Sequence, residues 1–159
     1  MPRIPEAIAP VFERYIRGPG LVREAVSGVG PATISRPGRE GWSVRDVLVH
    51  LSDGEMVRAT RFRLILAEEE PRLFGFDEGV WKRKLHYLWR SPEAALSLHE
   101  TLVFTNAELL KECDTKSWAR QGIHETDGPL SLGMLLERGA VHAETHAGQI
   151  REIRAMLEA

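Results

Sequence analysis

Apolar residues recur at helical spacing along most of this chain, and strand-like alternation of apolar and polar residues is hard to find. The segment 44–70 shows the helical spacing, with its buried face marked by Val44, Val47, Leu48 and Leu51. Ser43 and Asp46 provide a capping-box-like start for this segment, and Pro71 provides a stop. These signals predict one long helix between Ser43 and Pro71.

Two shorter helical pieces are expected before it. Residues 5–17 predict a first helix that breaks at Gly18-Pro19-Gly20, because proline and glycine both disfavour a helix interior. A short piece over 21–26 follows, and a loop rich in glycine and proline then runs to Gly41.

The second half of the chain contains three more helical signals. After a loop at 72–75, Asp77 is the expected N-cap of a helix over 78–89. Ser91-Pro92-Glu93 opens a helix that ends near Cys113. Its expected inward residues are Ala95, Leu98, Leu102, Leu109 and Leu110. A polar loop over 114–129 follows, and Ser131 caps a last helix that reaches almost to the C-terminus.

Three or four long helices with no strand between them favour an all-α bundle. The 159 residues are enough for one domain with a substantial core, and no repeat, low-complexity tract or linker divides them. We therefore expect residues 1–159 to form a single helical-bundle domain.

Composition narrows the class of protein. A hydrophobic content of 43% with 28% charged residues is typical of a globular chain, and the net charge of -2 gives no case for nucleic acid or anionic membrane as a partner. No apolar run approaches the ~20 residues that cross a bilayer. Residues 1–18 lack the apolar centre of a signal peptide, so we expect a cytoplasmic protein. The single cysteine, Cys113, excludes an intrachain disulfide and a cysteine-rich zinc site.

The last predicted helix carries the sequence HAETH, with His142 and His146 at positions i and i+4. This spacing places both imidazoles on one helical face. Leu135, Gln149 and Ile153 point within roughly 40° of the pair, so the face is turned toward the core. A metal ion would satisfy both rings at once; the alternative is that both are hydrogen-bonded core or surface residues. Glu144 lies on the opposite side, which excludes the zincin motif.

His50 adds a third imidazole from another core-facing helix. By itself it would be read as an ordinary buried histidine. Together, His50, His142 and His146 could supply the three ligands of an open metal site whose fourth position is left to water or substrate. Asp53, one turn after His50, could accept a hydrogen bond from an imidazole N–H or act as a nearby base.

Three segments resemble the DinB/YfiT-like superfamily: WSVRDVLVHLSDGE at 42–55, LFGFDEGVW at 73–81, and GIHETDGPLSLGMLLERGAVHAETHAGQI at 122–150. With the helices between them, the resemblance covers nearly the whole chain. It implies a four-helix bundle, often a homodimer, that holds a divalent ion such as nickel or zinc. The three metal ligands of the superfamily match His50, His142 and His146 residue by residue.

Other polar residues give weaker signals. His124, just before the last helix, matches a position where similar proteins often carry a histidine near the site mouth, so it could contact substrate, or it could be solvated. His86 and His99 are expected to be structural or exposed. Asp77 and Trp81 are explained by an N-cap and a core aromatic residue. Cys113 lies between two acids, Glu112 and Asp114, that disfavour a thiolate.

Two classes of function follow from these residues. The first is a metal-dependent enzyme acting on a small molecule: a hydrolase that activates water, or a transferase or isomerase that uses a low-molecular-weight thiol. The resemblance suggests both activities. The alternative is a non-enzymatic metal-binding or stress-associated bundle, and an apo helical interaction module ranks last. Fold alone does not decide between them, because function depends on the site.

Overall fold

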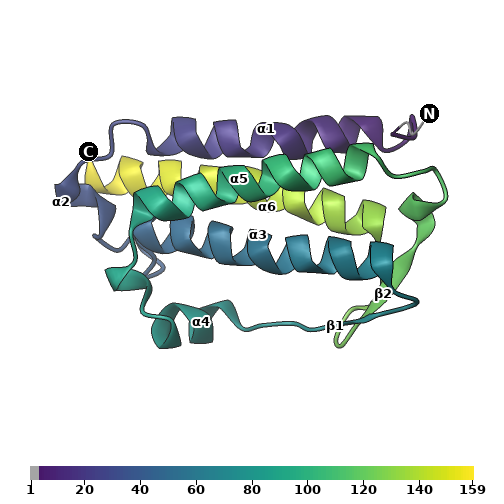
Figure 1. Cartoon of the computed structure of the whole chain (residues 1–159). Helices are drawn as coiled ribbons and strands as arrows, with labels where there is room; N and C mark the ends of the chain where they lie inside the picture. Colours follow the sequence, from purple (N-terminus) through teal and green to yellow (C-terminus); the bar gives the residue numbers. More distant parts are fainter. Residues whose placement is uncertain (1–3) are drawn as a thin grey trace.

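Four long helices lie side by side in the computed structural model, which describes residues 4–159 (Figure 1). They are α1 (Ala9–Val26), α3 (Val44–Ala67), α5 (Pro92–Lys111) and α6 (Leu132–Leu157). α1 and α6 run in one direction, whereas α3 and α5 run in the other (Figure 1). The predicted four-helix bundle is confirmed.

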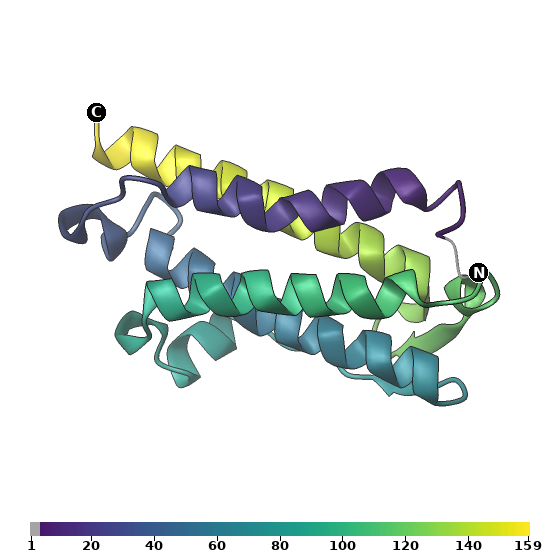
Figure 2. The same ribbon diagram turned by 45° about the horizontal axis from the view of Figure 1, so that its top comes forward.

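Short elements connect the long helices. The chain passes from α1 to α3 through α2 (Pro31–Ile34), and from α5 to α6 through the 3₁₀ turn η2 (Ser117–Ala119), β2 (Gln121–His124) and β3 (Gly128–Ser131). The return from α3 to α5 is longer and contains β1 (Arg72–Leu73), α4 (Glu78–Lys84) and the 3₁₀ turn η1 (Tyr87–Trp89). This long return places α4 beside α3, on the outside of the bundle (Figures 1 and 2).

The predicted helix starts are present as side-chain caps. The Ser43 hydroxyl accepts a hydrogen bond from the Asp46 amide while the Asp46 carboxylate accepts one from the Ser43 amide, which completes a capping box. Asp77, Ser91 and Ser131 cap α4, α5 and α6 in the same way, each accepting from the amide three residues on. Local sequence therefore determined where these four helices begin.

A three-stranded sheet replaces two of the predicted loops. β1 pairs in parallel with β2, and β2 pairs in antiparallel fashion with β3, at the end of the bundle where α3 finishes and α6 begins (Figure 1). The expectation of no strands was wrong because the strands are short and because β2 turns its polar histidine inward and its apolar isoleucine outward. Gly122 and His124 face inward, whereas Ile123 is 37% exposed.

Three further details differ from the sequence prediction. α1 continues through Pro19, because one buried face runs along the whole helix and packs against α6. The helix after Asp77 ends at Lys84, and His86 adopts a left-handed conformation with φ of 52° before η1. On α5, Leu98 is 39% exposed, whereas the polar residues His99 and Asn106 are buried, and Asn106 forms side-chain hydrogen bonds in the interior.

The buried face of α3 matches the prediction. Val44, Val47, Leu48 and Leu51 are all buried, and they join a hydrophobic cluster at the α2 end of the bundle. A second cluster, built around Phe12, Phe62 and Leu135, fills the end near the sheet. None of the helices between residues 4 and 159 is both long enough and apolar enough to cross a membrane.

Candidate metal centre

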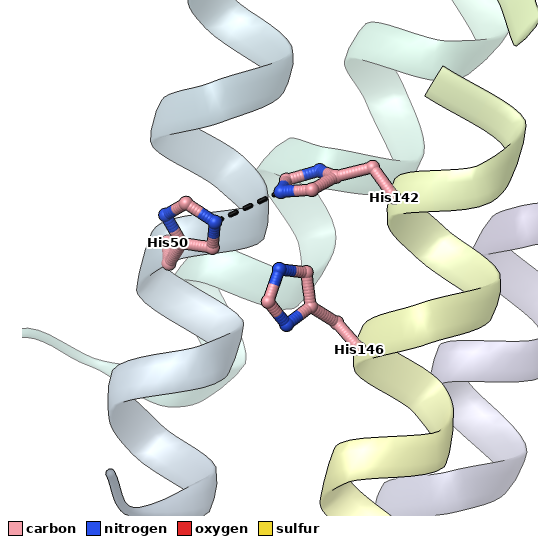
Figure 3. Close-up of side chains that lie close together, drawn as sticks. All are labelled: His50, His142 and His146. Carbon is pink, nitrogen blue, oxygen red and sulfur yellow. Dashed lines mark hydrogen bonds between the residues drawn. The ribbon is translucent and has the colours of Figure 1, made fainter. Parts of the chain in front are cut away.

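Three histidine side chains meet between α3 and α6 (Figure 3). The ring centroids lie 4.8 Å apart for His50 and His142, 4.8 Å for His50 and His146, and 4.5 Å for His142 and His146. One nitrogen from each ring lies within 4.8 Å of the other two. The predicted convergence of the rings is confirmed by this geometry, whereas their role as metal ligands stays a prediction.

The helices hold these rings at different depths. His50 is 3% exposed, and the Trp42 ring lies edge-on to it at 5.6 Å between centroids. His142 and His146 are partly buried on the facing side of α6. Gly54 lets α3 approach His142, because a Cβ at this position would lie 3.1 Å from His142 Cε1. The close approach of the two helices therefore depends on a missing side chain.

At least one of the two ring nitrogens that face each other in His50 and His142 carries a lone pair, because two N–H groups cannot satisfy each other at hydrogen-bond distance. His50 Nε2 and His142 Nε2 lie 2.8 Å apart. His146 Nδ1 lies 2.7 Å from Gln149 Oε1, an obligate acceptor, so Nδ1 carries the hydrogen and Nε2 keeps its lone pair. Sequence analysis had placed Gln149 on this face without assigning it this role, although its i+3 spacing from His146 was visible.

Burial keeps all three imidazoles neutral near pH 7. It lowers the pKa of His50 to about 4, with neighbouring His146 as the next cause. Burial also lowers the pKa of His142 well below its ordinary value, helped by the Arg58 cation, and lowers the pKa of His146. Neutral imidazole is the form that binds metal. The cluster is therefore in the protonation state that an ion requires.

Asp53 lies behind His50, at 1% exposure. Its Oδ2 accepts hydrogen bonds from the Tyr87 hydroxyl at 2.9 Å and from Arg90 at 2.7 Å. Among residues 4–159, its buried Oδ1 has no hydrogen-bond partner, and neither has His50 Nδ1. Two unsatisfied groups one helical turn apart, one an acceptor and one able to donate, suit the pairing that orients metal-binding histidines.

An open pocket of about 350 Å³ leads to this cluster. It is lined by Glu40, Trp42, Glu78, Thr145, His146, Gly148, Gln149 and Glu152. Glu78 stands at the start of α4, and its Oε2 lies 3.4 Å from His50 Nε2. Glu78 was not among the residues predicted from the sequence, because only the long return between α3 and α5 brings it to His50. The cluster is therefore accessible, with a carboxylate at its entrance.

Comparison with known protein families gives a match that includes the histidine cluster. The model of the DinB superfamily matches residues 14–150, which include all three histidines. The chain belongs to the DinB superfamily. The predicted family is confirmed, and this membership makes a metal-binding interpretation of the three rings the relevant one to test.

Several DinB relatives are similar over most of their length. The chain is 28% identical over 137 residues to "Putative metal-dependent hydrolase YfiT" of Bacillus subtilis, covering 85% of this chain and 77% of the relative. It is 30% identical over 142 residues to "Putative metal-dependent hydrolase GK0616" of Geobacillus kaustophilus, covering 87% and 80%. These names describe the relatives, and they agree with a metal-linked site.

Solved structures agree on the architecture. YfiT of Bacillus subtilis, described as a probable metal-dependent hydrolase with an unusual four-helix bundle topology, matches with a TM-score of 0.89 at 25% identity. The match covers 99% of this chain and 92% of YfiT. A mycothiol-dependent maleylpyruvate isomerase matches with a TM-score of 0.75 at 16% identity, over 92% of this chain and 61% of the isomerase. This second likeness shows the fold alone.

The DinB residues present here fit a divalent ion. Three neutral imidazoles with lone pairs turned to one point form the donor set that zinc, nickel and related ions prefer. Without an ion, His50 Nε2 and His142 Nε2 can form only one hydrogen bond between them. His50 Nδ1 also stays unpaired beside Asp53. The histidines, and not a cysteine, would therefore hold the ion.

The remaining candidate residues are not members of the three-histidine group. His99 is buried and His86 is exposed, which agrees with the structural or exposed roles expected for them. Burial raises the pKa of the Cys113 thiol, and the neighbouring acids raise it further, so a thiolate is disfavoured as expected. His124, the candidate substrate contact, is not in the loop that was predicted: it ends β2 at 8% exposure, beside Arg61.

Proposed function

We propose that this DinB-superfamily protein is a metal-dependent enzyme that acts on a small molecule. His50, His142 and His146 would hold one divalent ion, nickel or zinc, and the ion's open side would face the pocket at Glu78. The observation that carries the proposal is the meeting of three neutral imidazoles, with two ring nitrogens 2.8 Å apart, at the end of an accessible pocket. A purely structural ion would be enclosed, and this pocket argues against that alternative.

The chemistry of such an ion is well defined. A divalent ion on three histidines lowers the pKa of the water it binds toward ~7, polarises a substrate oxygen, or stabilises the thiolate of a low-molecular-weight thiol. Hydrolysis is our first choice, because the relatives similar over most of the chain carry hydrolase names. Thiol-dependent transfer or isomerisation is the second, suggested by the thiol-dependent isomerase that shares the fold.

The protein's own groups divide the remaining work. Glu78, 3.4 Å from His50 Nε2 and 61% exposed in its side chain, is placed to accept a proton from a nucleophile at the open position. Asp53, held by Tyr87 and Arg90, would accept the Nδ1 hydrogen of His50 and fix that ring, because Asp53 Oδ1 and His50 Nδ1 have no other partner among residues 4–159. Of the two roles predicted for Asp53, its burial behind His50 favours orientation over acting as the base.

Metal content tests the proposal directly. Elemental analysis of gently purified protein should give about one ion per chain for the parent and almost none for the His142→Ala/His146→Ala double variant. The His86→Ala variant is the matched control, because His86 is exposed and lies outside the cluster. Circular dichroism should show unchanged helix content in all three proteins. No metal in the parent after addition of nickel, zinc or manganese would overturn the proposal.

Activity separates the enzyme from a non-enzymatic metal-binding bundle. The loaded parent should turn over a member of a panel of esters and amides, or of electrophiles offered with a small thiol, and Glu78→Gln should slow that turnover by about 10²-fold or more with the ion retained. A loaded protein inert to both panels would favour the non-enzymatic alternative. Homodimerisation, expected from the family resemblance, is a separate prediction that light scattering at micromolar concentration checks.

A further inference from the structure

A second open pocket, of about 590 Å³, lies at the sheet end of the molecule, beside α3 and the end of β2. It is lined by Arg61, Gly75, Phe76, Asp77, His124, Glu125, Thr126, Asp127 and Arg138. His124 is the most informative of these, because it is 8% exposed and yet lines the pocket. Neither the three-histidine cluster nor the proposed reaction explains it.

The hydrogen bonds of His124 determine its tautomer. Nδ1 accepts from two backbone amides, that of Thr126 at 3.3 Å and that of Asp127 at 3.2 Å. Backbone N–H groups can only donate, so Nδ1 carries a lone pair and the ring hydrogen lies on Nε2. His124 therefore presents an N–H donor on its other side.

That donor faces another donor. His124 Nε2 lies 3.2 Å from the Arg61 guanidinium, which has no acceptor atom. Two donors at this distance cannot satisfy each other, and a shared acceptor between or beside them would satisfy both. Arg61 Nε is also buried without a partner. The pair therefore lacks an oxygen acceptor.

Arg61 also lacks a direct carboxylate partner among residues 4–159. Its terminal nitrogen donates to the Phe74 carbonyl instead. Burial lowers the pKa of its guanidinium and the cations of Arg58 and Arg138 lower it further, whereas the Asp127 and Glu125 carboxylates only partly offset these effects. An anion in the pocket would relieve both effects.

The two acids beside His124 already have partners, although Asp127 Oδ2 also lies 3.7 Å from His124 Nδ1. Asp127 pairs with Arg138 at 2.6 Å, and Glu125 Oε1 accepts from the Gly75 amide at 2.6 Å. Gly75 also leaves room next to the donor, because a Cβ there would lie 3.4 Å from His124 Nε2 and 2.9 Å from Glu125 Oε1. A ligand oxygen can therefore approach the side of the ring that a larger residue would cover.

A neighbouring pocket shares one lining residue with this pocket and another with the histidine cluster. Arg138 lines both pockets, and the neighbouring one, of about 470 Å³, also contains Arg58, Thr145 and His142. Arg138 and His142 are one turn apart on α6, or about 6 Å along the helix. We infer that Arg61 and His124 bind the terminal carboxylate, or an equivalent oxyanion, of an elongated small-molecule substrate. This inference rests on the proposed function for the choice of substrate as the ligand.

Nuclear magnetic resonance of histidine side chains tests it. The zinc-loaded full-length protein is titrated with sodium butyrate and, separately, with methyl phosphate at constant ionic strength. Saturable movement of the His124 Nε2–H resonance by either probe supports the site, and the stronger probe identifies the oxyanion. If neither probe moves the His124 Nε2–H resonance of the parent protein, the inference is overturned.

Variants then locate the interaction. Arg61→Gln should weaken probe binding at least tenfold, whereas Arg151→Gln, an exposed arginine on α6, should bind as the parent does. Equal binding by Arg61→Gln and the parent would overturn the inference. Repeating the titration on His142→Ala/His146→Ala separates the two proposals. Probe binding that persists in this double variant comes from the oxyanion site, whether or not the parent binds metal. Probe binding that is lost in the double variant overturns the inference.

Discussion

Two polar clusters lie inside the same bundle at similar depth, and they use their hydrogen-bonding groups differently. In the first, the core network, Glu55 is 1% exposed, and its Oε1 accepts from the Tyr15 hydroxyl and, at 3.0 Å, from Asn106. Its Oε2 accepts from Arg58 at 2.5 Å, and Asn106 Oδ1 accepts from Arg63 at 2.8 Å. Both Glu55 oxygens and the Asn106 amide have partners inside the network.

The histidine cluster is incomplete by comparison. His50, at 3% exposure, leaves Nδ1 unpaired, and Asp53 leaves Oδ1 unpaired. The other ring nitrogens of the histidine cluster together carry more lone pairs than hydrogens. Burial is therefore not what distinguishes a binding site from a polar core here. What distinguishes the binding site from the polar core is its unpaired hydrogen-bond donors and acceptors, because an unpaired buried group costs free energy that a ligand can recover.

The largest expected effect comes from breaking the core network. Glu55→Ala leaves the Arg58 cation and the Tyr15 hydroxyl without their acceptor, which should lower the free energy of unfolding by about 3–5 kcal/mol. Urea unfolding measures this loss. Glu13→Ala, an exposed glutamate on α1, should stay within about 0.5 kcal/mol of the parent. A similar small loss for Glu55→Ala would remove the distinction between the clusters.

Acid should act chiefly on the histidine cluster of the metal-free protein. Because burial lowers the pKa of His50 to about 4, the unfolded chain, with an ordinary histidine pKa near 6.5, takes up a proton first as the pH falls. Stability should therefore be full above about pH 6.5 and decline toward pH 4, where His50 alone accounts for roughly 3 kcal/mol. Urea unfolding at several pH values measures the decline.

His50→Gln provides the matched control for the acid effect. Its unfolding free energy should vary less with pH than that of the parent, because one of the depressed imidazoles is gone. A parent profile that is flat between pH 6.5 and pH 4 would show that the rings are protonated without penalty in the folded state.

A smaller effect, on zinc affinity, should come from changing Asp53. Asp53→Asn replaces the buried carboxylate proposed to orient His50 and should lower zinc affinity by about 10- to 100-fold. Competition with a chelator measures the affinity. Asp114→Asn, on an exposed loop, should leave it unchanged. Unchanged affinity in Asp53→Asn would mean that His50 does not depend on Asp53 for its orientation.

The smallest effect should come from removing one hydrogen-bond donor from the core network. Burial and the Glu55 carboxylate raise the pKa of Tyr15 well above its usual value, so the phenol donates to Glu55. Tyr15→Phe should cost about 1–2 kcal/mol of stability and leave zinc affinity as it is. A fall in zinc affinity would instead show that the two clusters are coupled, with Arg58 between them.

Helix starts and the histidine pair were predictable because they depend on local spacing. Ser43, Asp77, Ser91 and Ser131 cap their helices through amides only three residues away. The i, i+4 spacing of His142 and His146 determines that they share a face of α6, and the inward face of α3 brought His50 into the same set.

Tertiary structure decided the features that depend on contacts between distant segments. β2 turns a histidine inward and an isoleucine outward, so only its pairing with β1 and β3 defines it as a strand. Glu78 reaches His50 through the long return between α3 and α5, and Arg61 meets His124 from 63 positions away. The sequence alone thus determined where four helices begin and that the three clustered histidines face the interior. Packing between distant segments determined which donors and acceptors were left without partners.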